Sequence, residues 1–387
     1  MIVKREIEAE INESLKGYPV VVLTGARQTG KTTLVKYISD KPYYNFENPD
    51  VLDVALNDPR LLINKIKDKG AIIDEFQRAP DIASYLQGIV DEKQNPGMFI
   101  LTGSNNFLLM EKVSQSLAGR AAILNLNPFS IKELNAFNKS NETNELMYKG
   151  FFPAIHARNL NPSKAYSNYY KTYIEKDVRQ LVNIKDLRLF RLFVKLCAGR
   201  AGQLVNYEQI ANEIGVSGKI IKSWMSVLEA SYIVYFLPPY LSNINKRLIK
   251  SPKMYFYDVG LVSYLLDIEN SKQLESHPLR GSIFENMVIN EYLKYRHNHG
   301  LDMNAFFYRD NHKNEVDLIH KSGLDFIFIE IKSAQTYNNN FRKKLDWLEN
   351  VIHPNTVKKM VVYDGNEEYE KEGFKLVNYR NMIDALG

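Results

Sequence analysis

Short apolar runs dominate the first third of the chain, and the segments between them have apolar residues at helical spacing. The runs "PVVVL" (19–23), "AII" (71–73) and "MFIL" (98–101) each end in polar or small residues. Continuous apolar runs of this length are typical of strands buried in a parallel sheet. "TTLVKYI" (32–38) has helical spacing instead. The pattern predicts an α/β parallel-sheet domain at the N-terminus.

The middle of the chain changes to a helix–turn–helix–strand pattern. Residues 206–237, "NYEQIANEIGVSGKIIKSWMSVLEASYIVYFL", have apolar positions at helical spacing: Ile210, Ile214, Ile221, Trp224, Met225 and Leu228. "YIVYFL" then reads as a strand. This order predicts a winged-helix module. The basic run that follows, Lys246, Arg247, Lys250 and Lys253, is a candidate phosphate-backbone contact, but winged helices also serve as intramolecular lids or partner surfaces.

The last third predicts an amphipathic helix followed by a hairpin. "RGSIFENMVINEYLKYR" (280–296) has helical spacing, with Glu285 at the edge of its apolar face. "EVDLIHKSGLDFIFIEIKSA" (315–334) alternates as two strands, and Phe326, Phe328, Glu330 and Lys332 share one face. Pairing His320 with Asp325 would put Asp317 opposite Phe328 and diagonal to Glu330.

These placements predict three parts. A P-loop domain is expected over residues 1–160 and a helical linker with the winged-helix module over 161–250. An α/β domain takes residues 251–387. The break at "RNLNPSK" (158–164) marks the first boundary, and the polar run "NKSNETNE" (138–145) is expected to be a loop.

Composition indicates which partners and which cellular compartment suit this chain. The 387 residues carry a net charge of +5, which permits DNA or RNA partners without requiring them. Cys197 is the only cysteine, so no disulfide forms within one chain, as suits a reducing cytoplasm. The most apolar later stretch, "YIVYFLPPYL", is too short to span a bilayer. We expect a cytoplasmic protein without a membrane segment.

The segment "GARQTGKT" fits the phosphate-binding pattern G-x-x-x-x-G-K-[ST], set between a strand and a helix. A Gly-rich turn can point backbone N–H groups at a phosphate chain, with a helix N-terminus behind it. Lys31 would reach the β- and γ-phosphates and Thr32 would ligate Mg²⁺. The predicted cofactors are therefore ATP and Mg²⁺, and the binding residues are Gly25, Ala26, Arg27, Gln28, Thr29, Gly30, Lys31, Thr32 and Thr33.

Two further strands supply candidate catalytic groups. Asp74 and Glu75 close the second strand, where Asp74 would hold Mg²⁺ and Glu75 would activate the attacking water. Asn105 or Ser104, after the third strand, could contact the γ-phosphate or that water. Arg120, in a turn of small residues, could stabilise transition-state charge in cis or across a subunit interface, or simply pair with a surface carboxylate.

These segments resemble the AAA+ ATPases, specifically a prokaryotic family of predicted ATPases. The matching motifs are "GARQTGKTT", "IDEFQ", "LTGSNN" and "LAGR", with "GFFPAI" (150–155) and "YYKTYIEKDV" (169–178) as further family features. The family often has Pro where Ala26 stands. The resemblance covers nearly the whole chain and implies an ATPase of the AAA+/STAND-like kind, active as a homo-oligomer.

The hairpin residues resemble a second fold, that of the restriction endonucleases, whose motif reads D, a gap, then E-x-K. Asp317, Glu330 and Lys332 fit this motif, with Glu285 on the preceding helix. In such a site Asp317 and Glu330 would hold Mg²⁺ and Lys332 would steady the attacking hydroxide. Hairpin-end charges are also common as solvated groups, and some members of this fold bind without cutting.

The sequence thus leads to one main prediction and two alternatives. The main one is an ATP-driven switch in which binding and hydrolysis move the winged-helix and C-terminal regions. The alternatives are an ATP-regulated DNA or RNA endonuclease and a non-hydrolysing nucleotide-sensing adaptor.

Overall fold

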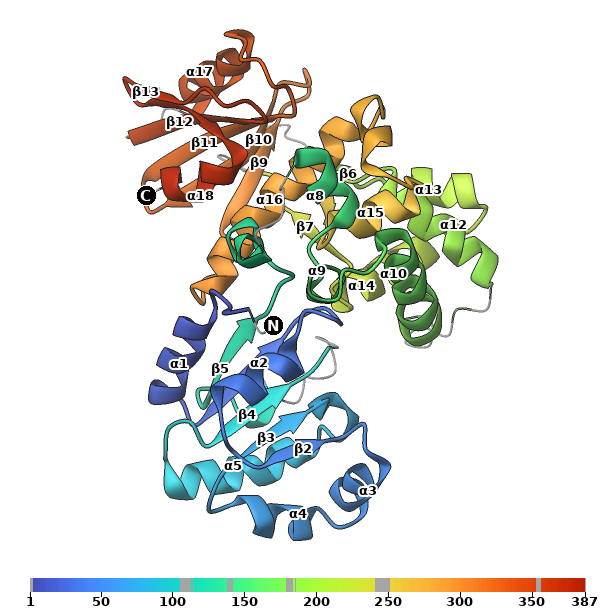
Figure 1. The fold of residues 1–387 in the computed structure, drawn as a ribbon, viewed down its shortest axis with the longest axis vertical. Helices are drawn as coiled ribbons and strands as arrows, with labels where there is room; N and C mark the ends of the chain where they lie inside the picture. Colours follow the sequence, from blue (N-terminus) through green and yellow to red (C-terminus); the bar gives the residue numbers. More distant parts are fainter. Residues whose placement is uncertain are drawn as a thin grey trace.

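The computed structural model describes residues 3–104, 113, 115–137, 142–178, 184, 186–240, 251–352 and 356–386. Within these ranges the chain is a mixed α/β protein, with a parallel-sheet domain at the N-terminus and a mixed-sheet domain at the C-terminus (Figure 1). The predicted fold class is confirmed at this level.

The N-terminal sheet is entirely parallel, in the order β2-β3-β4-β1-β5. Because β4 lies between β1 and β3, the ends of these three strands meet at one edge of the sheet. The strands are β1 (Val20–Thr24), β2 (Tyr43–Asn45), β3 (Ala71–Asp74), β4 (Phe99–Thr102) and β5 (Ala121–Asn125). The helices and turns are α1 (Glu8–Gly17), α2 (Lys31–Ile38), α3 (Pro49–Asn57), α4 (Pro59–Ile66), η1 (Phe76–Arg78) and α5 (Ile82–Lys93).

Helices cover both faces of this sheet. Val21 and Leu23 of β1 pack on one face with residues of α1 and α2, and Val20 and Val22 pack on the other with residues of α4 and α5. Successive side chains of a strand point to opposite faces. A strand between two helical layers is therefore apolar along its whole length, as the sequence pattern indicated.

The middle of the chain is mainly helical. Its first helices are α7 (Ile131–Leu134), α8 (Thr143–Lys149), α9 (Pro153–Ala157), α10 (Pro162–Tyr169) and the π-helix η3 (Tyr170–Val178), with the short turn η2 (Asn135–Phe137). They are followed by α12 (Leu187–Ala198), β6 (Gln203–Leu204), α13 (Tyr207–Ile214), α14 (Gly218–Ala230), β7 (Val234–Leu237) and β8 (Lys253–Phe256).

The three short strands form an antiparallel sheet in the order β6-β8-β7. Its central strand, β8, lies beyond residue 250, so the sheet crosses the boundary expected there. We call α12, α13, α14, β6, β7 and β8 the helix–sheet module. The short helices α15 (Val259–Leu265) and η4 (Ser271–Glu275) come next.

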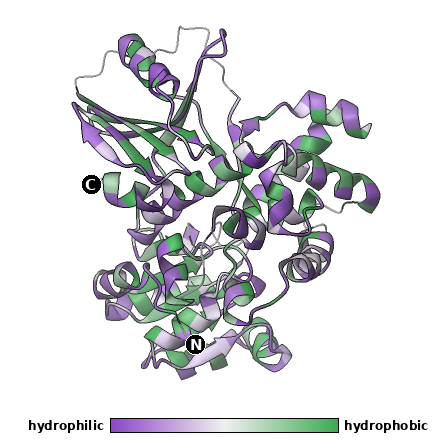
Figure 2. Cartoon of the chain, turned by 45° about the horizontal axis from the view of Figure 1, so that its top comes forward, coloured by the Kyte–Doolittle hydropathy of each residue, from purple (hydrophilic) through white to green (hydrophobic). Residues whose placement is uncertain are grey.

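The C-terminal sheet has the order β13-β14-β12-β11-β10-β9 and mixes parallel and antiparallel pairs. Its strands are β9 (Ala305–Arg309), β10 (Glu315–Ser322), β11 (Asp325–Lys332), β12 (Thr356–Tyr363), β13 (Tyr369–Lys371) and β14 (Phe374–Asn378). Its helices are α16 (Arg280–Asn298), α17 (Asn340–Ile352) and α18 (Met382–Leu386), with the turn η5 (Tyr379–Asn381). Hydrophobic residues run along the strands of this sheet, and the helices around it carry both hydrophilic and hydrophobic residues (Figure 2).

The expected hairpin register was wrong by two residues. Ser322 pairs with Asp325, so Ile319 rather than Asp317 lies opposite Phe328. The turn consists of only two residues and contains Gly323 at a φ of +62°. Two-residue hairpin turns favour such a left-handed glycine. Continuing this register places Asp317 directly opposite Glu330 instead of diagonal to it.

The helix α16 joins the two ends of the molecule, running from the C-terminal sheet towards the N-terminal domain (Figure 1). Its Glu291 accepts a hydrogen bond from the Ile131 backbone at 2.9 Å, and its Asn298 donates to Glu6 at 3.2 Å. In the part of the chain that the structure describes, no helix combines the length and apolarity needed to cross a bilayer.

Candidate functional site

The predicted phosphate-binding loop connects β1 to α2 at the edge where the strands of the N-terminal sheet end. Gly30 has a φ of +93° and precedes α2 directly. Gly25 has a φ of +138°, and a Cβ there would lie 2.2 Å from the Leu126 carbonyl oxygen. A side chain cannot occupy that space. The sequence therefore needs glycine at this point to let the loop turn against β5.

Arg5 and Lys31 hold this loop from within. The Arg5 guanidinium donates to the Thr29 carbonyl at 2.8 Å and pairs with Glu133 at 2.9 Å. The Lys31 ammonium donates to the carbonyls of Gly25 and Ala26, each at 2.8 Å. Burial lowers the pKa of Lys31 to about 8. Lys31 thus folds back onto the loop and is weakly basic for a lysine.

Asp74, at the end of β3, collects hydroxyl groups from three neighbouring elements. Thr32 donates to it at 2.7 Å and Tyr43 at 2.6 Å, and Thr102 of β4 also donates to its carboxylate. Asp74 is buried, so these bonds fix its position. The interaction of Thr32 with Asp74 brings together the two residues predicted to hold Mg²⁺.

Glu75 follows in a left-handed conformation, with a φ of +55°. Such a backbone is uncommon for a residue with a side chain, and strained residues of this kind often occur at functional sites. Burial raises the pKa of the Glu75 carboxyl, although Lys31 opposes this. Gln77 donates a hydrogen bond to its side chain. Glu75 is therefore a positioned carboxylate of increased basicity.

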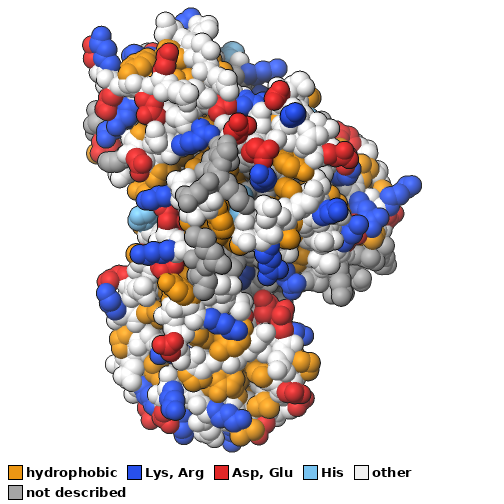
Figure 3. Space-filling view, viewed as in Figure 1, with side chains coloured by type: hydrophobic (Ala, Val, Ile, Leu, Met, Phe, Trp, Pro, Cys, Tyr) orange, Lys and Arg blue, Asp and Glu red, His pale blue; other side chains and the backbone are white. Residues whose placement is uncertain are grey.

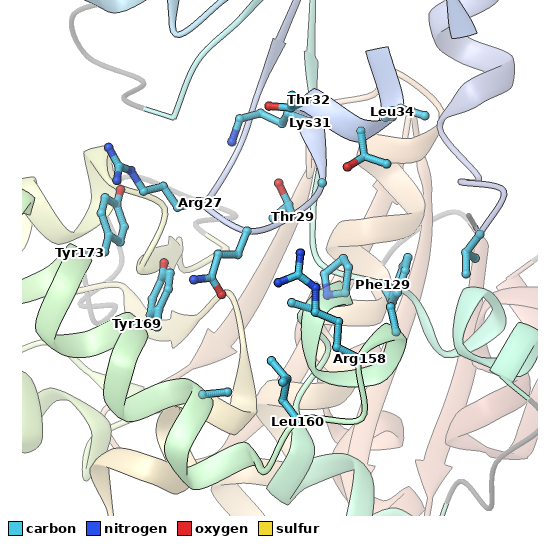
Figure 4. Close-up of a pocket in the computed structure, with 18 of the residues that line it drawn as sticks. Arg27, Thr29, Lys31, Thr32, Leu34, Phe129, Arg158, Leu160, Tyr169 and Tyr173 are labelled. Atoms are coloured by element: carbon cyan, nitrogen blue, oxygen red, sulfur yellow. The ribbon is translucent and has the colours of Figure 1, made fainter. Parts of the chain in front are cut away.

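A cavity of about 830 Å³ opens above the loop and is lined on one side by Arg27, Gln28, Thr29, Gly30, Lys31, Thr32, Thr33 and Glu75. Its opposite wall comes from α9, α10 and η3 and includes Arg158, Leu160, Tyr169 and Tyr173 (Figure 4). The Arg27 guanidinium lies 5.0 Å from the centre of the Tyr173 ring. Gly25 and Ala26 are part of the loop but do not line the cavity.

These residues fit a nucleotide with its magnesium ion. The positive-φ glycines let the loop curve around a phosphate chain, and Lys31 can exchange two neutral carbonyls for an anion. Oxygen ligands of the kind that Thr32 and Asp74 offer suit Mg²⁺. The cavity size is within the usual range for small-molecule sites.

The remaining predicted ATPase residues are the sensor position after β4, Ser104 or Asn105, and Arg120. Ser104 is buried beyond the end of β4, whereas Asn105 lies outside the described residues. Arg120 precedes β5, and its carbonyl accepts from Val20 at the start of β1. It therefore lies at the edge of the sheet opposite the loop, where its guanidinium pairs with Asp91 at 2.9 Å. Arg120 cannot reach the loop of its own chain, and a role across a subunit interface stays a prediction.

Sequence reasoning assigned no role to the wall opposite the loop. Tyr169 and Tyr173 lie within "YYKTYIEKDV" (169–178), which was identified only as a family feature. Arg158 was not predicted, because it is 127 positions from Lys31 in the chain. Tyr232 was missed for the same reason. Its hydroxyl donates to Thr24, the residue before the loop, at 2.7 Å. The helix–sheet module therefore touches the base of the loop directly.

The residues predicted for the nuclease-like site also lie close together, near the ends of β10 and β11. Lys332 pairs with Glu330, and its ammonium lies 3.9 Å from Asp317. The Asp317 carboxylate accepts from the Ile331 backbone at 2.8 Å. Glu285 of α16 accepts from Tyr255 at 2.6 Å and from Lys253 at 3.0 Å. Within the described ranges, no group of three or more histidine, cysteine or carboxylate side chains has a geometry that could hold a metal ion.

Lys253 does not contact nucleic acid as the basic run suggested, because its side chain is only 2% exposed and points into these carboxylates. Lys246, Arg247 and Lys250 lie outside the described residues. Over the face seen in Figure 3, basic and acidic side chains are interspersed, without a large patch of one sign.

One family model agrees with the N-terminal assignment. Family models match an AAA domain over residues 17–135 and domains of unknown function over 140–272 and 280–382. Uncharacterized proteins of Mycobacterium bovis and Mycobacterium tuberculosis are each 32% identical over 344 residues, covering 87% of this chain and 75% of theirs. A Walker-type ATPase structure from Pyrococcus abyssi aligns with a TM-score of 0.46 at 15% identity, covering 68% of this chain and 96% of its own.

Proposed function

This chain belongs to the family of the two mycobacterial proteins and carries an AAA domain, and on that premise we propose that it is a magnesium-dependent ATPase. The observation that carries this proposal is the contact between Thr32 and Asp74 beside a lysine and a glutamate that both face one cavity. Phosphoryl transfer depends mainly on positioning and on charge stabilisation, and these four side chains supply both.

Each side chain has a distinct task in this proposal. Lys31 leaves the two neutral loop carbonyls and binds phosphate oxygens, whose negative charge balances the charge of its ammonium group. Thr32 and Asp74 would hold Mg²⁺, which neutralises phosphate charge when it is bound. Glu75 accepts the proton of the attacking water, for which its raised pKa makes it a better base.

The cavity also supports the proposed coupling to the rest of the chain. A nucleotide bound there would touch the loop on one side and α9, α10 and η3 on the other. Tyr232 adds a contact between the helix–sheet module and Thr24. The element order of that module and its sheet order β6-β8-β7 support the winged-helix prediction. We infer that ATP binding and hydrolysis shift these helices relative to the N-terminal sheet.

Two substitutions test the proposal. Lys31→Ala is expected to abolish ATP binding, and Glu75→Gln is expected to bind ATP while losing turnover. Lys65→Ala and Glu92→Gln are exposed controls away from the cavity and should retain both properties. Calorimetry measures binding, and phosphate release measures turnover. Wild-type turnover in Lys31→Ala would refute the proposal, and tight ATP binding without turnover in the wild type would favour the adaptor.

DNA or RNA, and further copies of this chain, stay candidate partners. Turnover measured with and without single- and double-stranded DNA tests the first, and analytical ultracentrifugation with ATP tests the second. The endonuclease alternative requires carboxylates that are free to bind a metal. The ion pairs of Glu330 with Lys332 and Lys344 favour an ATPase that does not cut.

A further inference from the structure

A buried lysine of the helix–sheet module reaches into the carboxylates of the C-terminal domain. Lys253 lies on β8, and its side chain is 2% exposed. Its ammonium lies 2.7 Å from Glu315, 3.0 Å from Glu285 and 3.9 Å from Asp317. The three carboxylates lie on α16 and at the start of β10, so the lysine connects β8 with both of these elements. An ammonium group therefore lies among the carboxylates where the nuclease hypothesis places a metal ion.

The remaining charges of this carboxylate cluster are also paired. Glu330 contacts Lys332 and lies 3.1 Å from Lys344 of α17, and Arg309 lies 2.9 Å from Glu315. Four carboxylates, Glu285, Glu315, Asp317 and Glu330, thus face four cations, Lys253, Lys332, Lys344 and Arg309. The cluster has no net negative charge left to attract a divalent cation.

The neighbouring carboxylates keep Lys253 charged despite its burial. Burial alone would lower the pKa of Lys253, but Glu285, Asp317 and Glu315 outweigh it and raise the pKa above its usual value, so the ammonium stays charged. Burial, with Asp317 nearby, raises the pKa of Glu330 to about 7. The Oε2 atom of Glu330 is buried without a hydrogen-bond partner.

A divalent cation would have to enter against this arrangement. Mg²⁺ and Mn²⁺ bind oxygen ligands that carry uncompensated negative charge. Here at least one oxygen of each of the four carboxylates already lies within 4 Å of an ammonium or guanidinium group. The incoming ion would be repelled by the ammonium of Lys253, whose backbone is held between β6 and β7.

We propose that Lys253 takes the place of a divalent cation in this cluster, which joins the helix–sheet module to the C-terminal domain as an ionic contact. While β8 stays in position, the cluster binds no metal ion and the domain has no nuclease centre. Tyr255, also on β8, adds a second contact by donating to Glu285 at 2.6 Å. The ATPase proposal is independent of this inference.

Manganese titration of the full-length chain without nucleotide tests the inference, with free Mn²⁺ followed by electron paramagnetic resonance. The wild type and Asp317→Asn are expected to give the same isotherm, because the carboxylate of Asp317 is not a metal ligand. Lys253→Met removes the buried charge and is expected to gain one Mn²⁺ site per chain, at least tenfold tighter than any site of the wild type. The gain should disappear in the double variant Lys253→Met/Asp317→Asn.

Lys294→Met is the matched control. Lys294 is equally buried but forms an ion pair with only one carboxylate, Glu291, at 2.6 Å, so its removal should create no Mn²⁺ site. A wild-type Mn²⁺ site that is lost in Asp317→Asn would overturn the inference. So would a folded Lys253→Met variant, verified by circular dichroism, that gains no site. If Lys253→Met does not fold, the comparison of wild type with Asp317→Asn still decides.

Discussion

Removal of the Tyr232 hydroxyl is the smallest change that can test whether the helix–sheet module supports the phosphate-binding loop. Tyr232→Phe deletes one oxygen and leaves the buried ring in place. The deleted group donates to the Thr24 hydroxyl at 2.7 Å and lies 3.1 Å from the Asn125 side chain. Thr24 is the last residue of β1 and directly precedes Gly25, so the bond holds the strand from which the loop starts.

The expected energy follows from what remains after the substitution. A neutral hydrogen bond inside a protein contributes roughly 0.5–1.5 kcal/mol. Thr24 still donates to Asn125 at 2.6 Å, so no donor is left unsatisfied, and we expect a loss of about 1 kcal/mol in the free energy of unfolding. ATP binding cannot change by more than this coupling energy. Since about 1.4 kcal/mol corresponds to tenfold, ATP should bind at most about fivefold more weakly.

Urea unfolding and calorimetric titration with ATP and Mg²⁺ measure the two quantities. Tyr235→Phe is the control, because its buried hydroxyl donates to Asn290 at 2.7 Å, away from the loop. Asn290 keeps a second donor, Asn286, at 3.1 Å. Both variants should lose similar stability, and only Tyr232→Phe should bind ATP more weakly. Equal weakening in both, or unchanged stability in Tyr232→Phe, would refute the reasoning.

Three further predictions concern the loop and its cavity. Because burial lowers the pKa of Lys31 to about 8, the free chain loses this charge as pH rises through 8. ATP binding should then take up about one proton at pH 9 and none at pH 6.5. Calorimetry in buffers of different ionisation enthalpy measures this uptake, and equal uptake at both pH values would contradict the prediction. Arg158→Gln should weaken binding of ATP more than of adenosine, as competition titrations can show, because its exposed guanidinium faces the cavity; equal loss for both ligands would exclude a phosphate contact. Gly25→Ala should destabilise the chain by several kcal/mol, because the new Cβ would overlap with the Leu126 carbonyl. Gly30→Ala should destabilise it by only about 1 kcal/mol of backbone strain, because nothing lies closer than 3.9 Å to a Cβ there. Equal shifts in thermal unfolding would be inconsistent with this geometry.

The loop and its acidic strand could be predicted because their signals are local. A glycine-rich turn between an apolar strand and a helix specifies its own backbone, and Asp74 follows its strand directly. Adjacent parallel strands then bring Thr32, Asp74 and Thr102 together at one edge. The position of Arg120 could not be foreseen, since its turn resembles a catalytic one but precedes a strand instead of following it.

The rest depends on contacts between distant segments. Tyr232 meets Thr24 across 208 positions, and Arg158 reaches the cavity only after α9 and α10 have packed. Lys253 looked like part of an exposed basic run, and only the pairing of β8 between β6 and β7 turns it inward. The hairpin register failed on a smaller scale, because alternation is compatible with registers two residues apart and only the length of the turn distinguishes them.

The 19 residues of α16 make a rod about 28 Å long at 1.5 Å per residue. One end is fixed at the N-terminal domain by Asn298, and the other carries Arg280, which pairs with Asp364 of the C-terminal domain at 2.7 Å. A tilt of only about 5° at the first end would displace the second by about 2 Å, given that length. Small rearrangements around the phosphate-binding edge would therefore be magnified at the far side of the molecule.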